Sequence, residues 1–178
     1  MATLTRQDMI SALERLGQLA VADGYTLQLI VVGGAAMVLG YNARLSTRDI
    51  DALFLPPPAA RVVRVWAQII AREYGWTDDW LNDAAKGYLI GVSTGPVVLS
   101  APGIEVYQPA TEQLLAMKLC AWRDDVDIAD AERLLTDLAP GSNRLEVWQR
   151  VVPYLLPGRE LKAQYAFEDL WESVYGDA

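Results

Sequence analysis

The sequence predicts an α+β fold, in which a small mixed β-sheet flanked by helices is followed by a helical C-terminal region. Two observations support this prediction. Short apolar runs typical of strands are interleaved with helical periodicities up to about residue 107, and helical periodicities alone follow. The 178 residues also correspond to about one domain. We therefore expect a single domain over residues 1–178, with its core at about 25–107 and a helical part at about 108–178.

The first half of the chain predicts strands and helices in alternation. The expected order is a helix from about residue 5 to 23, a strand at 26–32, a short helix at 35–39, a strand at 48–55 and a helix at 60–74. Thr5, with Asp8 three residues later, indicates the cap of the first helix. Gly33 and Gly34 end the first strand. Three prolines from Pro56 stop the second strand, because proline cannot donate to a sheet ladder.

The second half begins with weak signals and becomes helical. Residues 75–95 predict a loop with about one helical turn, and strands at 97–99 and 103–107 follow around the turn Ala101-Pro102-Gly103. Helices are expected at 110–122, 128–138, 144–154 and 160–175.

The composition excludes several classes of function. Fifteen Lys and Arg against 23 Asp and Glu give a net charge of −8, which argues against a protein that coats nucleic acid. The absence of His removes Ser-His-Asp and Cys-His catalysis, His-ligated zinc and imidazole pH switches. Cys120, the only cysteine, fits a reducing compartment. Without a signal-peptide pattern or a long apolar run, we expect a soluble cytoplasmic protein with no membrane partner.

The pair Asp49 and Asp51 is the first candidate for chemistry. In a strand these side chains project from one face about 7 Å apart. Such carboxylates repel each other unless they are exposed, protonated or neutralised by a cation, and a bound divalent metal is the simplest resolution. Oxygen ligands without His select Mg²⁺ or Mn²⁺ over zinc. The alternative is a solvated strand.

Gly33 and Gly34 are the second candidate. Paired glycines would let backbone N–H groups approach a phosphate at the start of the short helix. By itself such a pair is usually a tight turn. The combination of strand, paired glycines, short helix, loop and a strand with two acids on one face is much less common.

These motifs resemble a known family. Gly33-Gly34, then fourteen residues, then Asp49-Ile50-Asp51 within the stretch 46–53 looks like the signature of the DNA polymerase beta-like nucleotidyltransferase superfamily. The helix 114–123, followed by Asp127-Ile128-Ala129-Asp130, is similar to its bacterial AbiEii-like branch, which includes toxins of toxin-antitoxin and phage-defence pairs. The resemblance covers about residues 25–138. It implies that the sheet is a nucleotidyltransferase core, which transfers a nucleoside monophosphate from an NTP to an acceptor with two metal ions and releases pyrophosphate.

The resemblance implies roles for the first motif. Asp49 and Asp51 would hold Mg²⁺ or Mn²⁺, and Gly33 and Gly34 would lie against the triphosphate. Arg48 would order the loop or contact phosphate. The second glycine is often Ser in relatives, so a hydroxyl contact to phosphate is missing here.

The resemblance also implies roles for later residues. Glu105 is the candidate third carboxylate for the metals, with a solvated strand residue as the alternative. Lys118 would contribute a point charge to the triphosphate; the alternative is a side chain that extends to solvent. Asp127 and Asp130 match acids of the family, and both also suit the capping of a helix start.

The expected function is that of a toxin that nucleotidylates RNA, such as the 3′ end of tRNA, with a cognate antitoxin protein as partner. Two alternatives stay open at this point. In the first alternative, the acceptor is a protein hydroxyl or a small molecule, which the acidic composition favours. In the second alternative, the chain is a non-catalytic nucleotide-binding module, as Gly34 in place of the Ser of relatives suggests.

Overall fold

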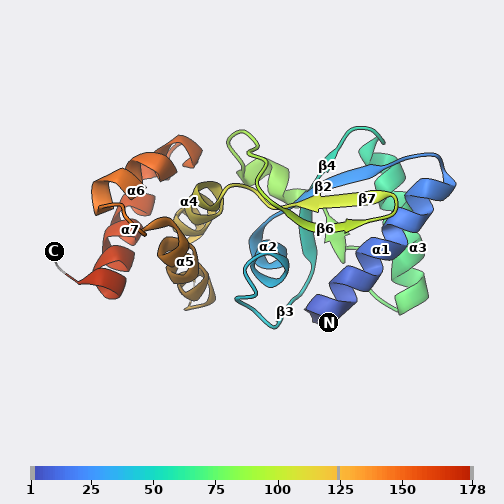
Figure 1. Ribbon diagram of the computed structural model, residues 1–178, viewed down its shortest axis with the longest axis horizontal. Helices are drawn as coiled ribbons and strands as arrows, with labels where there is room; N and C mark the ends of the chain where they lie inside the picture. The colour runs from blue at the N-terminus through green and yellow to red at the C-terminus, as the bar shows by residue number, and fades with distance from the viewer. Residues whose placement is uncertain (1–2, 124, 177–178) are drawn as a thin grey trace. The chain divides into compact units, whose positions relative to one another are not determined.

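The computed structural model describes residues 3–123 and 125–176, and the side chain of Tyr88 is not described. These residues form seven α-helices, a five-stranded mixed sheet and a two-stranded sheet, which confirms the predicted α+β fold (Figure 1). The chain divides into two compact units. The sheet unit comprises Met1–Gly87 and Thr94–Pro109, and the helical unit comprises Tyr88–Ser93 and Ala110–Ala178.

The five-stranded sheet is built around one central strand. Its order is β5 (Leu81–Asn82), β4 (Ile50–Leu55), β2 (Leu27–Val31), β7 (Ile104–Tyr107) and β6 (Val97–Ala101). β2 runs antiparallel to β4 and parallel to β7, and β5 runs parallel to β4. β6 and β7 form the predicted hairpin. β2 is the central strand, and its apolar run is mostly buried.

Two helices cover one face of the sheet. α1 (Arg6–Ala22) and α3 (Ala60–Tyr74) lie side by side (Figure 1). α1 approaches β7 so closely that a Cβ atom at Gly17 would lie 2.8 Å from Cγ2 of Ile104. By strand register, the covered face carries Leu29, Val31 and Ala52, whereas Val32 and Asp51 belong to the opposite face. The face with Asp51 is therefore the one opposite to α1 and α3.

A second, smaller sheet shapes the segment before β4. β1 (Leu4–Thr5) pairs with β3 (Ser46–Thr47), so residues 46–47 pair with the N-terminal segment and β4 begins at Ile50 rather than at residue 48. The short helix α2 (Gly33–Leu39) begins directly at the paired glycines, two residues earlier than predicted.

Local capping explains the first helix, whose prediction is confirmed. The Thr5 hydroxyl accepts from the Asp8 N–H at 3.2 Å, and the Asp8 carboxylate accepts from the Thr5 N–H at 2.9 Å. This reciprocal pair satisfies two backbone donors that a helix start otherwise leaves unpaired. The helices predicted at 60–74 and 160–175 are also confirmed.

The weak stretch 75–95 contains more structure than predicted. It holds the edge strand β5 and a 3₁₀ helix, η1 (Ala84–Tyr88). Trp80 anchors this stretch, since it is 2% exposed and its Nε1 donates to the Ala67 carbonyl at 2.9 Å. The Trp80 carbonyl accepts from the Ile50 N–H at 2.6 Å, which aligns β5 with β4.

The helical unit consists of α4 (Thr111–Ala121), α5 (Asp125–Leu138), α6 (Arg144–Val151) with the 3₁₀ helix η2 (Val152–Tyr154), and α7 (Glu160–Tyr175). Phe167 of α7 packs between Trp148 and Trp171 in its core. No helix among the described residues is long and apolar enough to cross a membrane.

Gln113 of α4, only 1% exposed, fastens the short segment 88–93 to the helical unit. Its Oε1 accepts from the N–H and the hydroxyl of Ser93, at 2.9 and 2.5 Å. Its Nε2 donates to the carbonyls of Ile90 and Gly91, at 3.2 and 3.1 Å. One buried amide thus holds three residues of this loop.

We predict that Gly17→Ala destabilises the protein. A Cβ atom there would lie 2.5 Å from the Pro102 carbonyl oxygen, so α1 or the β6–β7 hairpin must shift. Overpacking of this kind costs about 1–3 kcal/mol, whereas the helix propensity gained is at most about 1 kcal/mol. Chemical unfolding is expected to give a free energy of unfolding about 1–2 kcal/mol lower.

Gly87→Ala is the control, because no atom lies within 4 Å of a Cβ atom built at Gly87. It should change the free energy of unfolding by less than about 0.5 kcal/mol. Equal stabilities of the two variants would contradict the close packing of α1 on the hairpin.

Candidate functional site

The two aspartates lie at the end of the sheet where β4 begins. Asp51 is the second residue of β4, and Asp49 lies one residue before the strand. Both side chains are half-buried. The Val32 N–H donates to the Asp51 carbonyl at 2.9 Å, so the end of β2 and the start of β4 are held together. This pairing brings Asp51 next to the paired glycines that follow β2.

Asn82 on β5 connects the two aspartates. Its Cα is the register partner of Asp51, so both side chains point to the same face of the parallel pair. Its Nδ2 donates to Oδ2 of Asp49 at 3.2 Å. Asp49 and Asp51 therefore lie on the same face of the sheet, as the alternation predicts, although Asp49 is outside the strand.

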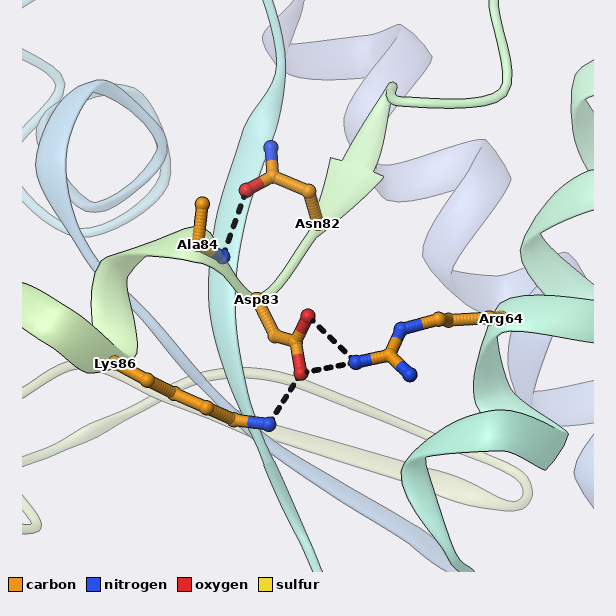
Figure 2. Close-up of polar contacts among 5 residues, drawn as sticks. All are labelled: Arg64, Asn82, Asp83, Ala84 and Lys86. Atoms are coloured by element: carbon orange, nitrogen blue, oxygen red, sulfur yellow. Dashed lines mark hydrogen bonds and ion pairs between the residues drawn. The ribbon is translucent and has the colours of Figure 1, made fainter.

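The residue after Asn82 ties this edge to α3. One guanidinium nitrogen of Arg64 reaches both carboxylate oxygens of Asp83, at 2.9 and 2.7 Å, and Lys86 Nζ also contacts that carboxylate (Figure 2). These cations keep the pKa of Asp83 below its ordinary value, with the Arg64 hydrogen bond as the largest cause. Arg64 and Lys86 are about half exposed, so the cluster contributes mainly to geometry rather than to stability.

The electrostatics of Asp49 favour a cation. Burial raises the pKa of its carboxyl above the ordinary value, the Asn82 hydrogen bond lowers it, and the charge of Asp79 raises it again. The charge of Arg48 lowers that pKa, which places Arg48 within electrostatic reach of Asp49. The net direction is upward, with burial as the largest cause, so the ionised form of Asp49 is less favoured than it is in water.

The donor set fits Mg²⁺ or Mn²⁺ that arrives with a nucleotide. Asp49 and Asp51 supply carboxylate oxygens, and Mg²⁺ commonly uses one or two carboxylates together with substrate phosphates. Within residues 3–123 and 125–176, no group of three or more acidic or sulfur side chains is arranged to hold a metal. Because substrate phosphates would add ligands to the two carboxylates, we expect a metal-nucleotide complex to bind more tightly than the free ion.

Gly33 and Gly34 each face a particular side chain. Gly33 has φ of +56°, the left-handed region that favours glycine, and a Cβ there would lie 3.8 Å from Oδ2 of Asp51. At Gly34 a Cβ would lie 2.5 Å from Oγ1 of Thr47 and 3.3 Å from Nη1 of Arg44. The space next to Gly34 is thus filled by a hydroxyl and a guanidinium that come from another segment.

Glu105 is not brought to the two aspartates. It is the register partner of Gln28 on β2, four residues before Val32, which pairs with Asp51. Four strand residues span about 13 Å, and β2 also separates β7 from β4. Glu105 instead accepts from the Tyr107 hydroxyl at 2.6 Å and from Gln28 at 3.2 Å. The interpretation of Glu105 as third metal carboxylate does not fit this geometry, because register places it too far along the sheet.

Lys118 joins Asp127 and Asp130 in a buried cluster of the helical unit. Its Nζ lies 2.7 Å from Oδ1 of Asp127 and 2.7 Å from Oδ2 of Asp130. All three residues are at most 7% exposed, so Lys118 does not extend to solvent. Arg123 also donates to Asp127, at 3.0 Å. Asp127 and Asp130 on α5 therefore form ion pairs with Lys118 on α4. Helix capping, the alternative role expected from the sequence, does not include these ion pairs.

The balance of charges in this cluster is favourable. Burial raises the pKa of Asp127, but hydrogen bonds from Lys118 and then Arg123 outweigh it, and the net pKa lies below the ordinary value. An ammonium has three donors, and the two carboxylates take two of them. The cluster locks α4 to α5.

Three residues of the sheet-unit site were not predicted. Asn82 lies on a two-residue strand, and the pattern of so short an element carries little signal. Thr47 and Arg44 are adjacent to the Asp49–Asp51 motif in sequence, but their approach to Gly34 depends on the pairing of β3 with β1. The polar residues directly before Asp49 were the one sequence signal that could have indicated Arg44 and Thr47 as site residues.

We predict that Lys118→Met strongly destabilises the protein. It would leave Asp127 and Asp130 buried without the ammonium between them, and loss of one partner of a buried ion pair costs about 3–5 kcal/mol. The triple variant that adds Asp127→Asn and Asp130→Asn should recover part of this loss. Denaturant unfolding measures each free energy.

Arg133→Met is the matched control, because Arg133 and Asp137 form an exposed i,i+4 ion pair on α5. Its expected cost is about 0.5 kcal/mol or less. Equal losses for Lys118→Met and Arg133→Met would contradict a structural role for the buried cluster.

Comparison with known proteins gives one match. No curated protein and no solved structure matches this chain. A sequence model of a protein family, described as a nucleotidyltransferase of unknown function (DUF6036), matches residues 8–138. That range includes Asp49, Asp51 and the Lys118 cluster, and it covers more than half of the 178 residues. The chain therefore belongs to this nucleotidyltransferase family.

Proposed function

We propose that this protein is a Mg²⁺-dependent nucleotidyltransferase that transfers a nucleoside monophosphate from an NTP to an acceptor hydroxyl. The carrying observation is the sheet end where Gly33, Asp49 and Asp51 meet, with an Asp51 oxygen in contact distance of the Gly33 position. In the reaction, a bond forms between the acceptor oxygen and the α-phosphorus, the bond to the leaving pyrophosphate breaks, and the acceptor hydroxyl passes its proton to water.

Each residue of the site has a defined task in this proposal. Asp49 and Asp51 hold the cation, and the cation supplies charge neutralisation of the triphosphate. Gly33 and Gly34 leave the backbone N–H groups open to phosphate oxygens. Thr47 supplies the hydroxyl that a Ser at position 34 would otherwise bring, and Arg48 adds positive charge beside Asp49.

Lys118 keeps a role in the proposal alongside its structural one. Asp127 and Asp130 hold the ammonium in a fixed orientation within the helical unit, and its contact with the triphosphate rests on the resemblance alone. In this view the two acids position Lys118 and do not themselves contact nucleotide.

The charge distribution bears on the acceptor. The sheet unit has eight Lys and Arg against ten Asp and Glu, and the helical unit has seven against thirteen. The acidity therefore belongs mainly to the helical unit, so it argues only weakly against an RNA acceptor at the sheet unit. We propose RNA, such as the 3′ end of tRNA, as the acceptor of a toxin with a cognate antitoxin. The acidic helical unit supports a second candidate, a basic protein as acceptor.

We predict Mg²⁺-dependent labelling of an acceptor. Purified protein is incubated with each α-³²P-labelled NTP and Mg²⁺, and with either total RNA or a protein extract. Label should appear in one fraction, and Asp49→Asn or Asp51→Asn should reduce it at least about 100-fold, because each removes a cation ligand.

Glu172→Gln is the control for these variants, since Glu172 is an exposed acid of α7. It should label like the wild type. No label on any acceptor, with Asp49→Asn indistinguishable from the wild type, would refute transfer and leave a nucleotide-binding module. The labelled fraction distinguishes RNA from protein acceptors.

We further predict that Thr47→Val raises the KM for NTP about fivefold with little change in kcat. The variant keeps the shape of the side chain and loses one hydrogen bond to phosphate, which is worth about 1 kcal/mol. Thr47→Ser keeps the hydroxyl and should restore the wild-type KM. An unchanged KM in Thr47→Val would show that this hydroxyl does not contact the nucleotide.

A further inference from the structure

Asp49 needs support from outside its own strand. It precedes β4 by one residue, so the ladder of β4 does not fix its side chain directly. Asn82 donates a hydrogen bond to its carboxylate, at 3.2 Å from Nδ2 to Oδ2. A ligand to a cation must be held in a defined orientation, and such outer contacts usually fix it.

The orientation of the Asn82 amide follows from its other contact. Its Oδ1 accepts from the Ala84 N–H at 3.0 Å. Only the amide oxygen can accept a hydrogen bond, so the NH₂ group must face the other way, toward Asp49 (Figure 2 shows the contact with Ala84). The backbone of Ala84 therefore determines that Asn82 presents a donor to the carboxylate.

The backbone around Asn82 is anchored on both sides. Two residues before it, buried Trp80 accepts from the Ile50 N–H and donates to α3. Directly after it, Asp83 is held by Arg64 and Lys86 (Figure 2). A two-residue edge strand would fray without such anchors. These contacts hold the backbone of Asn82 in place, so its side chain can fix the position of the Asp49 carboxylate.

From this geometry we infer that Asn82 is a positioning residue, which holds one oxygen of Asp49 so that the carboxylate presents its other oxygen to a divalent cation. This inference rests on the proposed function, and it adds a residue that neither the motif nor the family match assigns. Asn82 acts through Asp49 and is not expected to contact the nucleotide.

The test is Mn²⁺ binding by Asn82→Ala, followed by electron paramagnetic resonance. The full chain is titrated with Mn²⁺ in the presence of a nucleotide whose α,β-bridging oxygen is replaced by CH₂, so that no transfer occurs. We expect Mn²⁺ to bind about tenfold more weakly than to wild type, in the range typical for loss of an outer contact. With a reactive NTP, kcat should fall about tenfold and the KM for NTP should stay within twofold.

Asn143→Ala provides a matched control. Asn143 also accepts from a backbone N–H with its side chain, at 3.0 Å from Glu146 N, but it caps α6 in the helical unit. Both variants should lower the Tm by a few degrees, and Mn²⁺ affinity should fall in Asn82→Ala alone.

The outcomes distinguish a failure of the inference about Asn82 from a failure of the proposed function. If Asn82→Ala binds Mn²⁺ within twofold of wild type, Asn82 has a structural role only and the inference is overturned while the proposed function stands. If wild type binds no Mn²⁺ with the nucleotide, the proposed function and this inference both fall.

Discussion

The antiparallel pairing of β2 with β4 is the constraint on which the site depends. Because the Val32 N–H bonds to the Asp51 carbonyl, the glycines that follow β2 must lie beside the acids that begin β4. A register shift by one residue would turn Asp51 toward the face covered by α1 and α3. Buried apolar residues on that face therefore keep Asp51 on the opposite face.

Much of this arrangement is predictable from sequence, and the exceptions have physical causes. Long periodic helices such as α3 and α7, and the apolar run of β2, carry enough signal to be recognised alone. Two-residue strands such as β5 carry almost none, so Asn82 was missed. Glu105 matched an apolar-acid-apolar pattern, but register, which a single strand does not encode, places it beside Gln28.

Lys118 and Asp49 are both at least partly shielded from solvent, but they differ in how their charges are balanced. Lys118 is surrounded by two acids, so its charge is compensated within the protein. Burial raises the pKa of Asp49, and the Asn82 contact and the charge of Arg48 do not fully offset it. The ammonium of Lys118 is therefore paired within the helical unit, whereas burial leaves the ionised form of Asp49 less favoured than it is in water. This contrast supports a functional role for Asp49 beyond stability.

The segment held by Gln113 has a consequence for how the chain can be divided. The backbone passes between the two units three times, after Gly87, Ser93 and Pro109. A fragment cut at Pro109 would lose Ile90, Gly91 and Ser93, and the buried Gln113 amide would be left without the partners that they supply. The helical unit is therefore not encoded by one continuous segment of the chain. Recombination or truncation at its apparent boundary would sever part of its own structure.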